Sequence, residues 1–334
     1  MRFGRILTVL LAVVLSVLCL SGCKTDEPAN EAVYFTVKFN SAGGTEIEDM
    51  KVLSGNKISE PAEPEKEGHI FNGWRNGVKS WNFASDTVTA DVTLTASWIN
   101  AGTIFETEKV DDDGDKVMDR VILTEYIGSL SSFTIPSVID GLPVTDIGDG
   151  AFSSSVREEL EGIVIGENIK SVGESAFANC TGLSIKVESK LSYVGEKAFY
   201  GCDGLESIEL GEGLECVPYQ AFSGCTALRT VVLPSTVSSI EENAFEFCSS
   251  LQTVTVHSAL KTVGDSAFKD CSSLVTVFYY GTAENWAETE IAEGNDGNDT
   301  FAAARFYMYS ETKPDESTEG EYWYFDGDGD KRIW

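Results

Sequence analysis

The chain has 334 residues and a formal net charge of −30, from 54 acidic and 24 basic side chains. That length is too great for one compact core and predicts two or three modules. The strong negative charge repels nucleic acid and anionic lipid headgroups, so the composition excludes both as partners of the exposed surface. The acidity suits solubility and cationic partners, but it does not specify one.

Residues 1–22 have the pattern of an export signal. Arg2 and Arg5 provide a short basic start, and residues 6–20 are almost entirely apolar. This run is too short, and too close to a cleavage site, for a spanning helix. It ends in the tetrapeptide Leu-Ser-Gly-Cys at residues 20–23, which resembles the bacterial lipobox.

The lipobox resemblance implies that Cys23 becomes the first residue of the mature protein and carries a thioether-linked lipid. An ordinary secretory signal with a chance cysteine is the alternative. Several acyl chains would hold the protein on its membrane without a spanning helix. No later segment has the apolar length needed to span a membrane, so everything after Cys23 is expected to lie in water. Residues 23–32 are polar and charged and predict a solvated tether.

Residues 33–99 predict a small β domain. Two alternating apolar runs, residues 33–39 and 88–98, flank a Gly43-Gly44 turn and a proline-containing stretch. Alternation of this kind is typical of strands that bury one face. The segment therefore predicts a sheet with its own core.

Four segments in this region carry a family resemblance. The series FTVKFNSAGGT, PAEPEKEGHIFNGW, WNF and VTADVTLTASW resembles the Listeria-Bacteroides repeat, also called the internalin B-repeat. The resemblance implies a β-grasp-like fold that serves as a spacer or interaction module in surface proteins. The aromatic residues would then be packing residues, with an aromatic carbohydrate platform as the alternative. They are Trp74, Trp81, Phe83 and Trp98.

An internal repeat dominates the remainder of the chain and decides its fold. Each unit contains an Ala-Phe pair, whose phenylalanines are Phe152, Phe177, Phe199, Phe222, Phe245 and Phe268. A cysteine stands three residues after each of the last five, at Cys180, Cys202, Cys225, Cys248 and Cys271. A leucine follows each cysteine by three residues, and a short alternating stretch with β-branched residues comes next. This stretch predicts one half-buried strand in every unit.

A unit of 22–25 residues with one strand cannot bury its apolar side chains alone, so identical units should stack. The consensus LxxVxLPxxVxxIxxxAFxxCxxL resembles the BspA-type leucine-rich repeat of bacterial surface antigens, and residues 228–250 match it nearly position for position. The resemblance implies a mainly β solenoid with short helical turns over residues 100–310, closed by a C-terminal cap. It also implies contact with host matrix proteins, host cells or other bacteria.

The cysteine spacing argues against a disulfide framework. Five cysteines recur at intervals of 22 or 23 residues, which is the repeat period. A ladder of buried thiols is expected, because a small thiol packs well and can donate weakly to the carbonyl of a neighbouring coil. Disulfides between adjacent coils and a metal site are the alternatives, although stacked cysteines form a line rather than a converging set. Cys216 falls outside the ladder and is the most plausible reactive thiol.

The strand alternation also predicts a candidate binding face. In each unit the side chain between the two inward strand residues should point outward. This outer row comprises Val164, Lys186, Glu209, Val232, Thr255 and Phe278, and a second row two residues earlier contains Thr230, Thr253 and Thr276. Solenoids present such extended faces to ligands, whereas strand propensity on a solvated face is the alternative interpretation. An exposed Val232 and Phe278 would be unusual without a partner or a cap.

No catalytic constellation is present in the sequence. The two histidines, His69 and His257, lie in different modules and outside any recognised motif. Two acidic runs, Asp111 to Asp115 and Asp326 to Asp330, suggest calcium or ordinary tight turns. In the second run Asp326, Asp328 and Asp330 alternate as in a calcium loop, but a lysine stands where an EF-hand needs glycine. No metal or cofactor other than this weak calcium candidate and the lipid on Cys23 is expected.

The sequence therefore predicts a cell-surface lipoprotein that is not an enzyme. Residues 311–334 would form a linker and an aromatic terminal hairpin built on Tyr322 to Phe325. The leading hypothesis is an adhesin or protein-binding module that uses the solenoid face. A glycan-binding or nutrient-capture lipoprotein that works with a transporter is the alternative. In both cases the partner is a protein or glycan on host or neighbouring cells.

Overall fold

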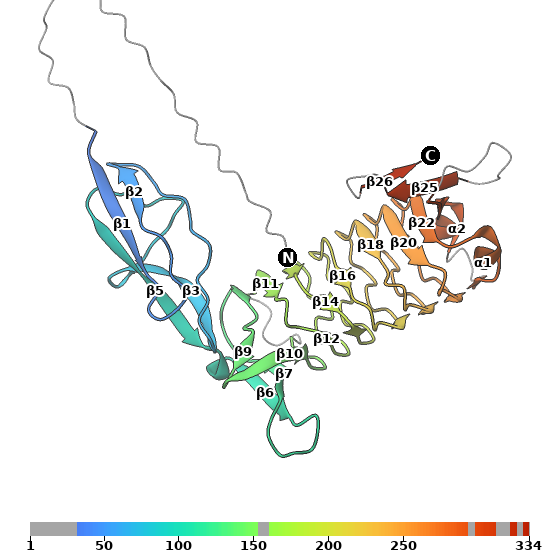
Figure 1. Ribbon diagram of the computed structural model, residues 1–334, viewed down its shortest axis with the longest axis horizontal. Helices are drawn as coiled ribbons and strands as arrows, with labels where there is room; N and C mark the ends of the chain where they lie inside the picture. Colours follow the sequence, from blue (N-terminus) through green and yellow to red (C-terminus); the bar gives the residue numbers. More distant parts are fainter. Residues whose placement is uncertain (1–31, 153–159, 293–297, 312–320, 326–329, 334) are drawn as a thin grey trace, which may run out of the picture.

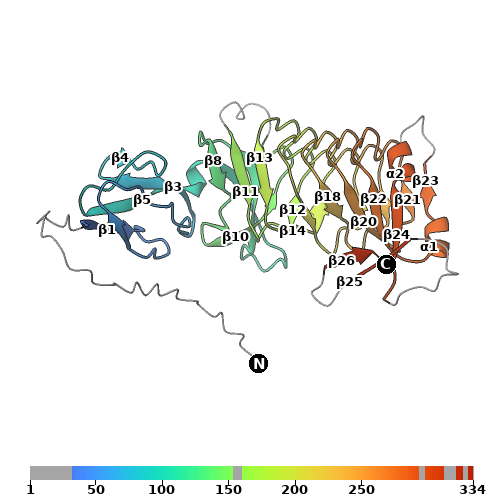
Figure 2. The same ribbon diagram turned by 90° about the horizontal axis from the view of Figure 1, so that it is seen from above.

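The computed structural model describes residues 32–152, 160–292, 298–311, 321–325 and 330–333. A small β domain lies at one end of an elongated molecule, and a coiled solenoid extends from it to the other end (Figure 1). Figure 2 shows the successive coils side by side along the long axis. The predicted mainly β solenoid behind a small β domain is confirmed. The signal segment, the lipobox and Cys23 lie outside the described residues.

The small domain is one twisted sheet. Its strands are β1 (Tyr34–Asn40), β2 (Met50–Leu53), β3 (His69–Asn76), β4 (Lys79–Ser80) and β5 (Val92–Asn100), in the order β2-β1-β5-β3-β4. β1 and β5 are parallel, and the other neighbours are antiparallel. Trp74 is 1% exposed and packs edge-on against Phe39 and Phe71. Trp81, Phe83 and Trp98 pack against the same core, so these aromatic side chains serve the interior of the domain.

The small domain and the solenoid are joined through packed residues. β5 runs directly into a short 3-10 helix, η1 (Ala101–Thr103), and then into β6 (Phe105–Val110). The amide of Ala101 donates to the carbonyl of Gly68 at 2.9 Å. Ile70 of β3 is 3% exposed and belongs to the hydrophobic core of the solenoid. The two modules therefore share buried side chains at their junction.

The entry coil begins with an antiparallel hairpin of β6 and β7 (Arg120–Tyr126). It continues through β8 (Ser132–Thr134), β9 (Val138–Ile139) and β10 (Leu142–Ile147). β10 pairs in parallel with β7, which starts the parallel stacking of the solenoid.

Each following coil contributes strands to two parallel stacks. The first stack contains β11 (Gly162–Ile165), β13 (Ser184–Val187), β16 (Glu209–Leu210), β18 (Thr230–Val232), β20 (Thr253–His257) and β22 (Thr276–Tyr280). The second contains β12 (Ser171–Val172), β15 (Tyr193–Val194), β17 (Cys216–Val217), β19 (Ser239–Ile240), β21 (Thr262–Val263) and β23 (Glu290–Ile291), and β14 (Lys190–Leu191) lies between β13 and β15 in the chain. Parallel pairing joins β11 to β13, β18 to β20 and β22, β12 to β15, and β17 to β19, β21 and β23. β16 pairs with β14, so the regular pairing among the described strands is interrupted at the third coil. The 23-residue period therefore reappears as the spacing of the coils.

The phenylalanines form a continuous stack through the solenoid interior. The six predicted rings lie nearly parallel, with centroids 4.7–5.6 Å apart from one coil to the next. Tyr126 of the entry hairpin extends the stack at one end, at 5.8 Å from Phe152. Phe301 extends it at the other end, at 4.3 Å from Phe268. Every coil thus buries an aromatic ring against both of its neighbours.

Each coil turns sharply on both sides of its phenylalanine. The residues two before the ring in the last five coils have φ of 54–56°, and those two after it have φ of 58–77°. Asparagine, aspartate or glycine fills four of the five later positions and tolerates this left-handed backbone. Phe247 is the fifth, and its side chain is 49% exposed. Packing therefore does not account for a phenylalanine at this turn.

A cap of different structure closes the far end. It contains α1 (Ala283–Ala287), α2 (Asp299–Ala303), β24 (Arg305–Tyr309), β25 (Glu321–Phe325) and β26 (Lys331–Ile333). Trp286, Phe301 and Phe306 pack together over the last coil, with centroids 4.6–6.1 Å apart. β24 and β25 continue the first stack in parallel, and β26 returns antiparallel beside β25. The aromatic segment is therefore part of the solenoid sheet.

None of the helices in the described part of the chain has the length and apolar character needed to cross a membrane.

Candidate binding face of the solenoid

The candidate face is the outer side of the first strand stack, where pairing aligns equivalent residues. Thr230 lies opposite Thr253, which lies opposite Thr276. Two residues later in the same strands, Val232 lies opposite Thr255, which lies opposite Phe278. Side chains at these positions stand roughly perpendicular to the sheet, so each row runs along the stack.

The residues of the two rows differ in their access to solvent. Lys186, Glu209 and Thr230 are exposed, and the side chain of Val232 is 52% exposed. Val164, Thr253 and Thr276 are half-buried, and Thr255 is only 1% exposed. The face is therefore open over the middle coils and covered toward the C-terminal cap.

The outer row is interrupted between the second and third coils. The repeat spacing places Glu209 beside Lys186, but the sheet pairs Glu209 with Lys190, and Lys186 pairs with Val164. The side chains of Lys190 and Glu209 lie 4.0 Å apart. The partner of Glu209 is thus four residues later in the chain than the regular repeat spacing predicts. Lys186 and Glu209 are thus not direct neighbours in one row.

Thr255 and Phe278 do not belong to the open surface, which corrects their assignment to the candidate face. The ammonium of Lys331 in β26 donates to the hydroxyl of Thr255 at 2.8 Å. The same ammonium lies 4.7 Å from the ring centroid of Phe278 and 5.1 Å from that of Trp323. β26 and β20 are well separated in the sheet order, so the end of the sheet must curl over its own outer face. Figure 1 shows β25 and β26 beside β20 and β22.

This curl creates a second aromatic core on the outer face. Trp323 is fully buried, and its ring centroid lies 4.6 Å from Tyr280, 5.1 Å from Tyr309 and 5.2 Å from Phe278. The aromatic run from residue 322 to 325 predicted a terminal hairpin, but it did not predict which residues the hairpin would cover. A local sequence pattern does not indicate packing against strands that are distant in the chain.

The charged groups beside this core are partly withdrawn from water. Burial lowers the pKa of Lys331. Burial also lowers the pKa of His257. The charge of Glu212 acts against this decrease, and the charge of Lys331 adds a smaller decrease. The imidazole of His257 stacks flat on Tyr280, with centroids 4.4 Å apart. His257 is therefore placed as a packing residue.

The part of the face that remains accessible is named here the open face. It comprises Lys186, Lys190, Glu209, Thr230 and Val232. The open face thus combines two lysines and a glutamate with the hydroxyl of Thr230 and the exposed apolar side chain of Val232. Such a surface can form hydrogen bonds, ion pairs and apolar contacts together, as protein interfaces do.

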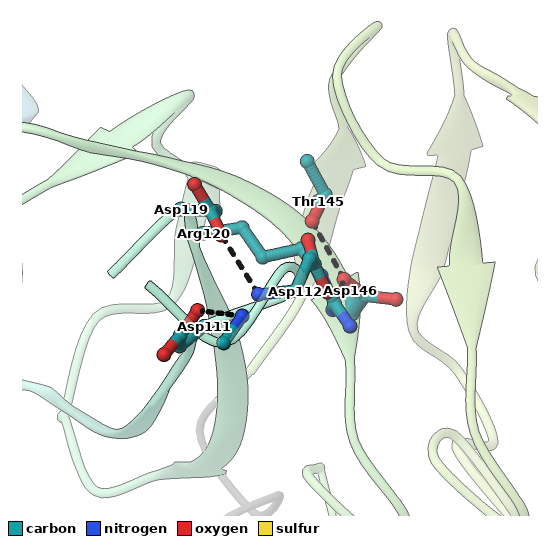
Figure 3. A network of polar contacts seen from close by, with 7 residues as sticks. Asp111, Asp112, Asp119, Arg120, Thr145 and Asp146 are labelled. Atoms are coloured by element: carbon teal, nitrogen blue, oxygen red, sulfur yellow. Dashed lines mark hydrogen bonds and ion pairs between the residues drawn. The ribbon is translucent and has the colours of Figure 1, made fainter. Parts of the chain in front are cut away.

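The acidic run at residues 111–115 forms the loop between β6 and β7 (Figure 3). One carboxylate oxygen from each of Asp111, Asp113 and Asp115 can be chosen so that all three lie within 4.8 Å of one another. Asp111 accepts the amides of Lys116 at 2.9 Å and Gly114 at 2.7 Å. These hydrogen bonds, that of Lys116 first, lower the pKa of Asp111. The oxygen donors suit a hard cation such as Ca²⁺, and the hydrogen bonds equally define an ordinary turn.

An arginine ties this loop to the solenoid. Figure 3 shows Arg120 between Asp112 of the loop and Asp146 of β10. Its Nε lies 3.0 Å from Asp112, and its Nη1 contacts Asp146. Of the other calcium candidate, Asp326 and Asp328 lie outside the described residues. Asp330 lies 3.3 Å from the guanidinium of Arg332.

The repeated cysteines line the interior and point at backbone carbonyls. Each Sγ faces the carbonyl oxygen of the phenylalanine in the preceding coil, at 3.1–3.2 Å for the last four and 3.9 Å for Cys180. All five are at most 1% exposed. Burial raises the pKa of Cys202, Cys225 and Cys248 well above the ordinary thiol range. The six cysteines within the described ranges are thiols rather than disulfides.

Cys216 is expected to react with a thiol reagent before any ladder cysteine. Cys216 is half-buried, whereas the ladder cysteines are buried, so a reagent can reach its sulfur more easily. Burial, and then the charges of Glu241 and Glu215, raise the pKa of Cys216. Because the thiolate is the reactive form, the reaction rate should increase as the pH rises above 8. The check is Ellman's reagent on the folded secreted chain, with mass spectrometry to locate the modified residue. Cys216→Ser is the control and should remove the fast phase. Fast modification of Cys225 in folded protein would contradict this ordering.

Comparisons with known proteins agree with this architecture. Residues 145–275 match the BspA-type leucine-rich repeat region in six copies, and residues 35–97 match the Listeria-Bacteroides repeat domain. A protein of Evansella cellulosilytica described as a Gly-rich membrane protein is 43% identical over 67 residues, which cover 19% of this chain and 8% of that protein. A second membrane protein of that organism is 40% identical over 74 residues, covering 21% and 11%. The matches thus span only a small part of these relatives.

Two solved structures are similar to the chain. A leucine-rich repeat protein of T. pallidum has 25% identity and a TM-score of 0.46, covering 62% of this chain and 95% of that one. A leucine-rich cell surface protein of Faecalibacterium prausnitzii has 22% identity and a TM-score of 0.38, covering 50% and 52%.

The stacked coils, their phenylalanine and cysteine rows and the two family matches lead to one assignment. The chain is a BspA-like leucine-rich-repeat protein: residues 145–275 carry the BspA-type repeats, and residues 35–97 carry the Listeria-Bacteroides repeat domain.

Proposed function

We propose that this protein is a lipid-anchored surface protein that binds a protein ligand through the open face and has no enzymatic role. The observation that carries the proposal is the parallel sheet over the middle coils, where Val232 is 52% exposed among polar neighbours. An apolar side chain flanked by charges and hydroxyls is a common anchor in interfaces. The repeat family of surface antigens and the relatives described as membrane proteins support the cell-surface location.

A charge placed in the open face should weaken ligand binding. Val232→Arg is expected to weaken binding at least about tenfold, because it removes an apolar anchor and introduces a cation that must be desolvated. The measurement is a binding screen of the secreted chain against immobilised matrix proteins, mucin and partner cells, followed by titration of each hit. The matched control is Val78→Arg in the small domain, whose side chain is 96% exposed.

The outcome of this screen separates protein binding from glycan capture. Retention of binding by deglycosylated ligand, with loss in Val232→Arg alone, supports the proposal. Binding that depends on the glycan would favour the capture role. Equal losses in both arginine variants would exclude the open face as the site.

Lipid attachment has its own test. Cys23→Ala should move the protein from the membrane fraction to the medium or periplasm, because a thioether-linked lipid needs the sulfur of Cys23. The measurement is fractionation with metabolic labelling by a fatty acid, and Cys216→Ala is the matched control. Unchanged labelling of the Cys23→Ala protein would refute the anchor.

A further inference from the structure

A cleft separates the small domain from the first coils of the solenoid. Its volume is about 790 Å³. One wall is formed by residues 63–71 and Trp98, and the other by residues 134–138 and 166–169. Ligand sites are usually of this size and often lie where two domains meet. No residue of the open face lines the cleft, although the two surfaces adjoin where Lys186 pairs with Glu188.

The walls of the cleft are fixed relative to each other. Ile70, which lines the cleft, is buried in the solenoid core, and the amide of Ala101 donates to Gly68 at 2.9 Å. β3 and β5 are paired along the same wall, from His69 opposite Asn100 to Phe71 opposite Trp98. A ligand would therefore enter a preformed space and would not have to order its walls.

Both walls of the cleft carry acidic residues in their lining. Glu63, Glu65 and Glu67 belong to the small domain, and Glu167 and Glu188 belong to the solenoid. Glu188 pairs with Lys186 at 2.6 Å. Within the part of the chain that the structure covers, the other four have no ion pair within 4.0 Å. Burial, and next the charge of Glu60, raises the pKa of Glu63. The lining of the cleft thus carries more negative charge than the ion pairs of its acidic residues neutralise.

The cleft is also lined by apolar side chains that remain partly accessible. Phe71 and Trp98 of the small domain and Val138 of the solenoid are half-buried there. Lys66 lies 5.7 Å from the ring centroid of Trp98, which shows that this ring accepts a cation on its face. An occupant should therefore combine positive charge with apolar side chains.

We propose that the cleft binds a basic, partly apolar peptide segment of a partner protein, with lysine or arginine side chains directed at Glu63 and Glu167. Anionic glycans, nucleic acid and phosphate are disfavoured by the same carboxylates. A divalent cation is also disfavoured, because among the described residues the acidic groups that converge to metal distances are Asp111, Asp113 and Asp115, outside the cleft. This site is additional to the ligand of the open face.

The test is fluorescence anisotropy of a labelled pentapeptide, Lys-Leu-Lys-Leu-Lys, titrated with the secreted chain. The double variant Glu63→Gln, Glu167→Gln should bind about tenfold more weakly, because each lost ion pair is worth up to about fivefold. Thr134→Arg, which adds a cation to the lining of the cleft, should weaken binding at least as much.

The control must separate a built site from the general acidity of the chain. Glu206→Gln with Glu290→Gln makes the same change of charge at exposed residues outside the cleft. This control pair should stay within about twofold of the parent chain, and the peptide Glu-Leu-Glu-Leu-Glu should not bind. An equal loss in both double variants, or no binding of the basic peptide by the parent chain, would overturn the proposal. Val232→Arg should leave peptide binding unchanged, which distinguishes this site from the open face.

Discussion

Replacing Phe222 by alanine is expected to lower the free energy of unfolding by about 4 kcal/mol, the typical cost of removing a fully buried aromatic side chain. The ring of Phe222 is 0% exposed and lies 5.6 Å from Phe199 and 5.3 Å from Phe245. Its removal leaves a cavity that faces a ring on each side. Because coils are stable only through their neighbours, a gap in the middle of the stack weakens both halves.

Equilibrium denaturation in urea, followed by circular dichroism, measures this loss. Phe247→Ala is the matched control, because Phe247 is 49% exposed and its truncation should change stability by about 0.5 kcal/mol or less. Phe222→Leu should lose clearly less than Phe222→Ala, since it keeps most of the apolar volume. If Phe222→Ala lost less than about 1 kcal/mol, the phenylalanine stack would not be the main source of coil cohesion.

The repeated part of the fold was predictable because the last five units share one local pattern. A phenylalanine, a cysteine and a leucine at constant spacing must each contact the same residue type in the next unit, so the period fixes both burial and stacking. The carbonyl partner of each cysteine follows from the same geometry. For Cys248 that partner is the oxygen of Phe222, at 3.1 Å.

The ends of the solenoid were less predictable, because their residues depart from the period. Tyr126 and Phe301 occupy the terminal rungs of the ring stack, yet neither follows the Ala-Phe spacing. Tyr126 enters from a hairpin strand, and Phe301 enters from a short helix. Each element fills the position by its three-dimensional packing, which sequence spacing does not report.

The candidate face was predicted in outline and corrected in two places. Alternation within a strand correctly placed Val232 on the outer surface, 52% exposed. It could not show that Glu209 pairs with Lys190, because constant spacing predicts Lys186 as the partner and does not report a local change of register. It also could not show that β26 covers Thr255, since that contact joins residues distant in the chain.

The acidic cleft had no sequence signal. Glu63 precedes a strand of the small domain, and Glu167 follows a strand of the solenoid. In a chain with 54 acidic residues, neither position stands out. Only the fixed junction at Ile70 and Ala101 brings them to the same space.

Trp323→Ala should detach the terminal hairpin from the outer face and leave the solenoid folded. Trp323 is 0% exposed and contacts Phe278, Tyr280 and Tyr309, so about 3 kcal/mol of packing would be lost. Stability in stacked coils is largely a sum of neighbour contacts, so the loss should stay local. Hydrogen exchange should show that the substitution speeds amide exchange in the paired strands β24 and β25 more than in β18, relative to the parent chain.

The contrast between two substitutions makes this expectation specific. The indole N–H of Trp323 is buried without a hydrogen-bond partner among the described residues, so Trp323→Phe removes an unsatisfied donor and keeps much of the ring packing. Trp323→Phe should therefore keep the hairpin in place, and Tyr193→Ala, at a residue 56% exposed on the solenoid, should change little.

With the hairpin released in Trp323→Ala, the ring of Phe278 and the hydroxyl of Thr255 would join the open face, and dye binding to apolar surface should increase. Unchanged exchange and dye binding in Trp323→Ala would mean that contacts other than the indole, such as those of Lys331, hold the end of the sheet in place.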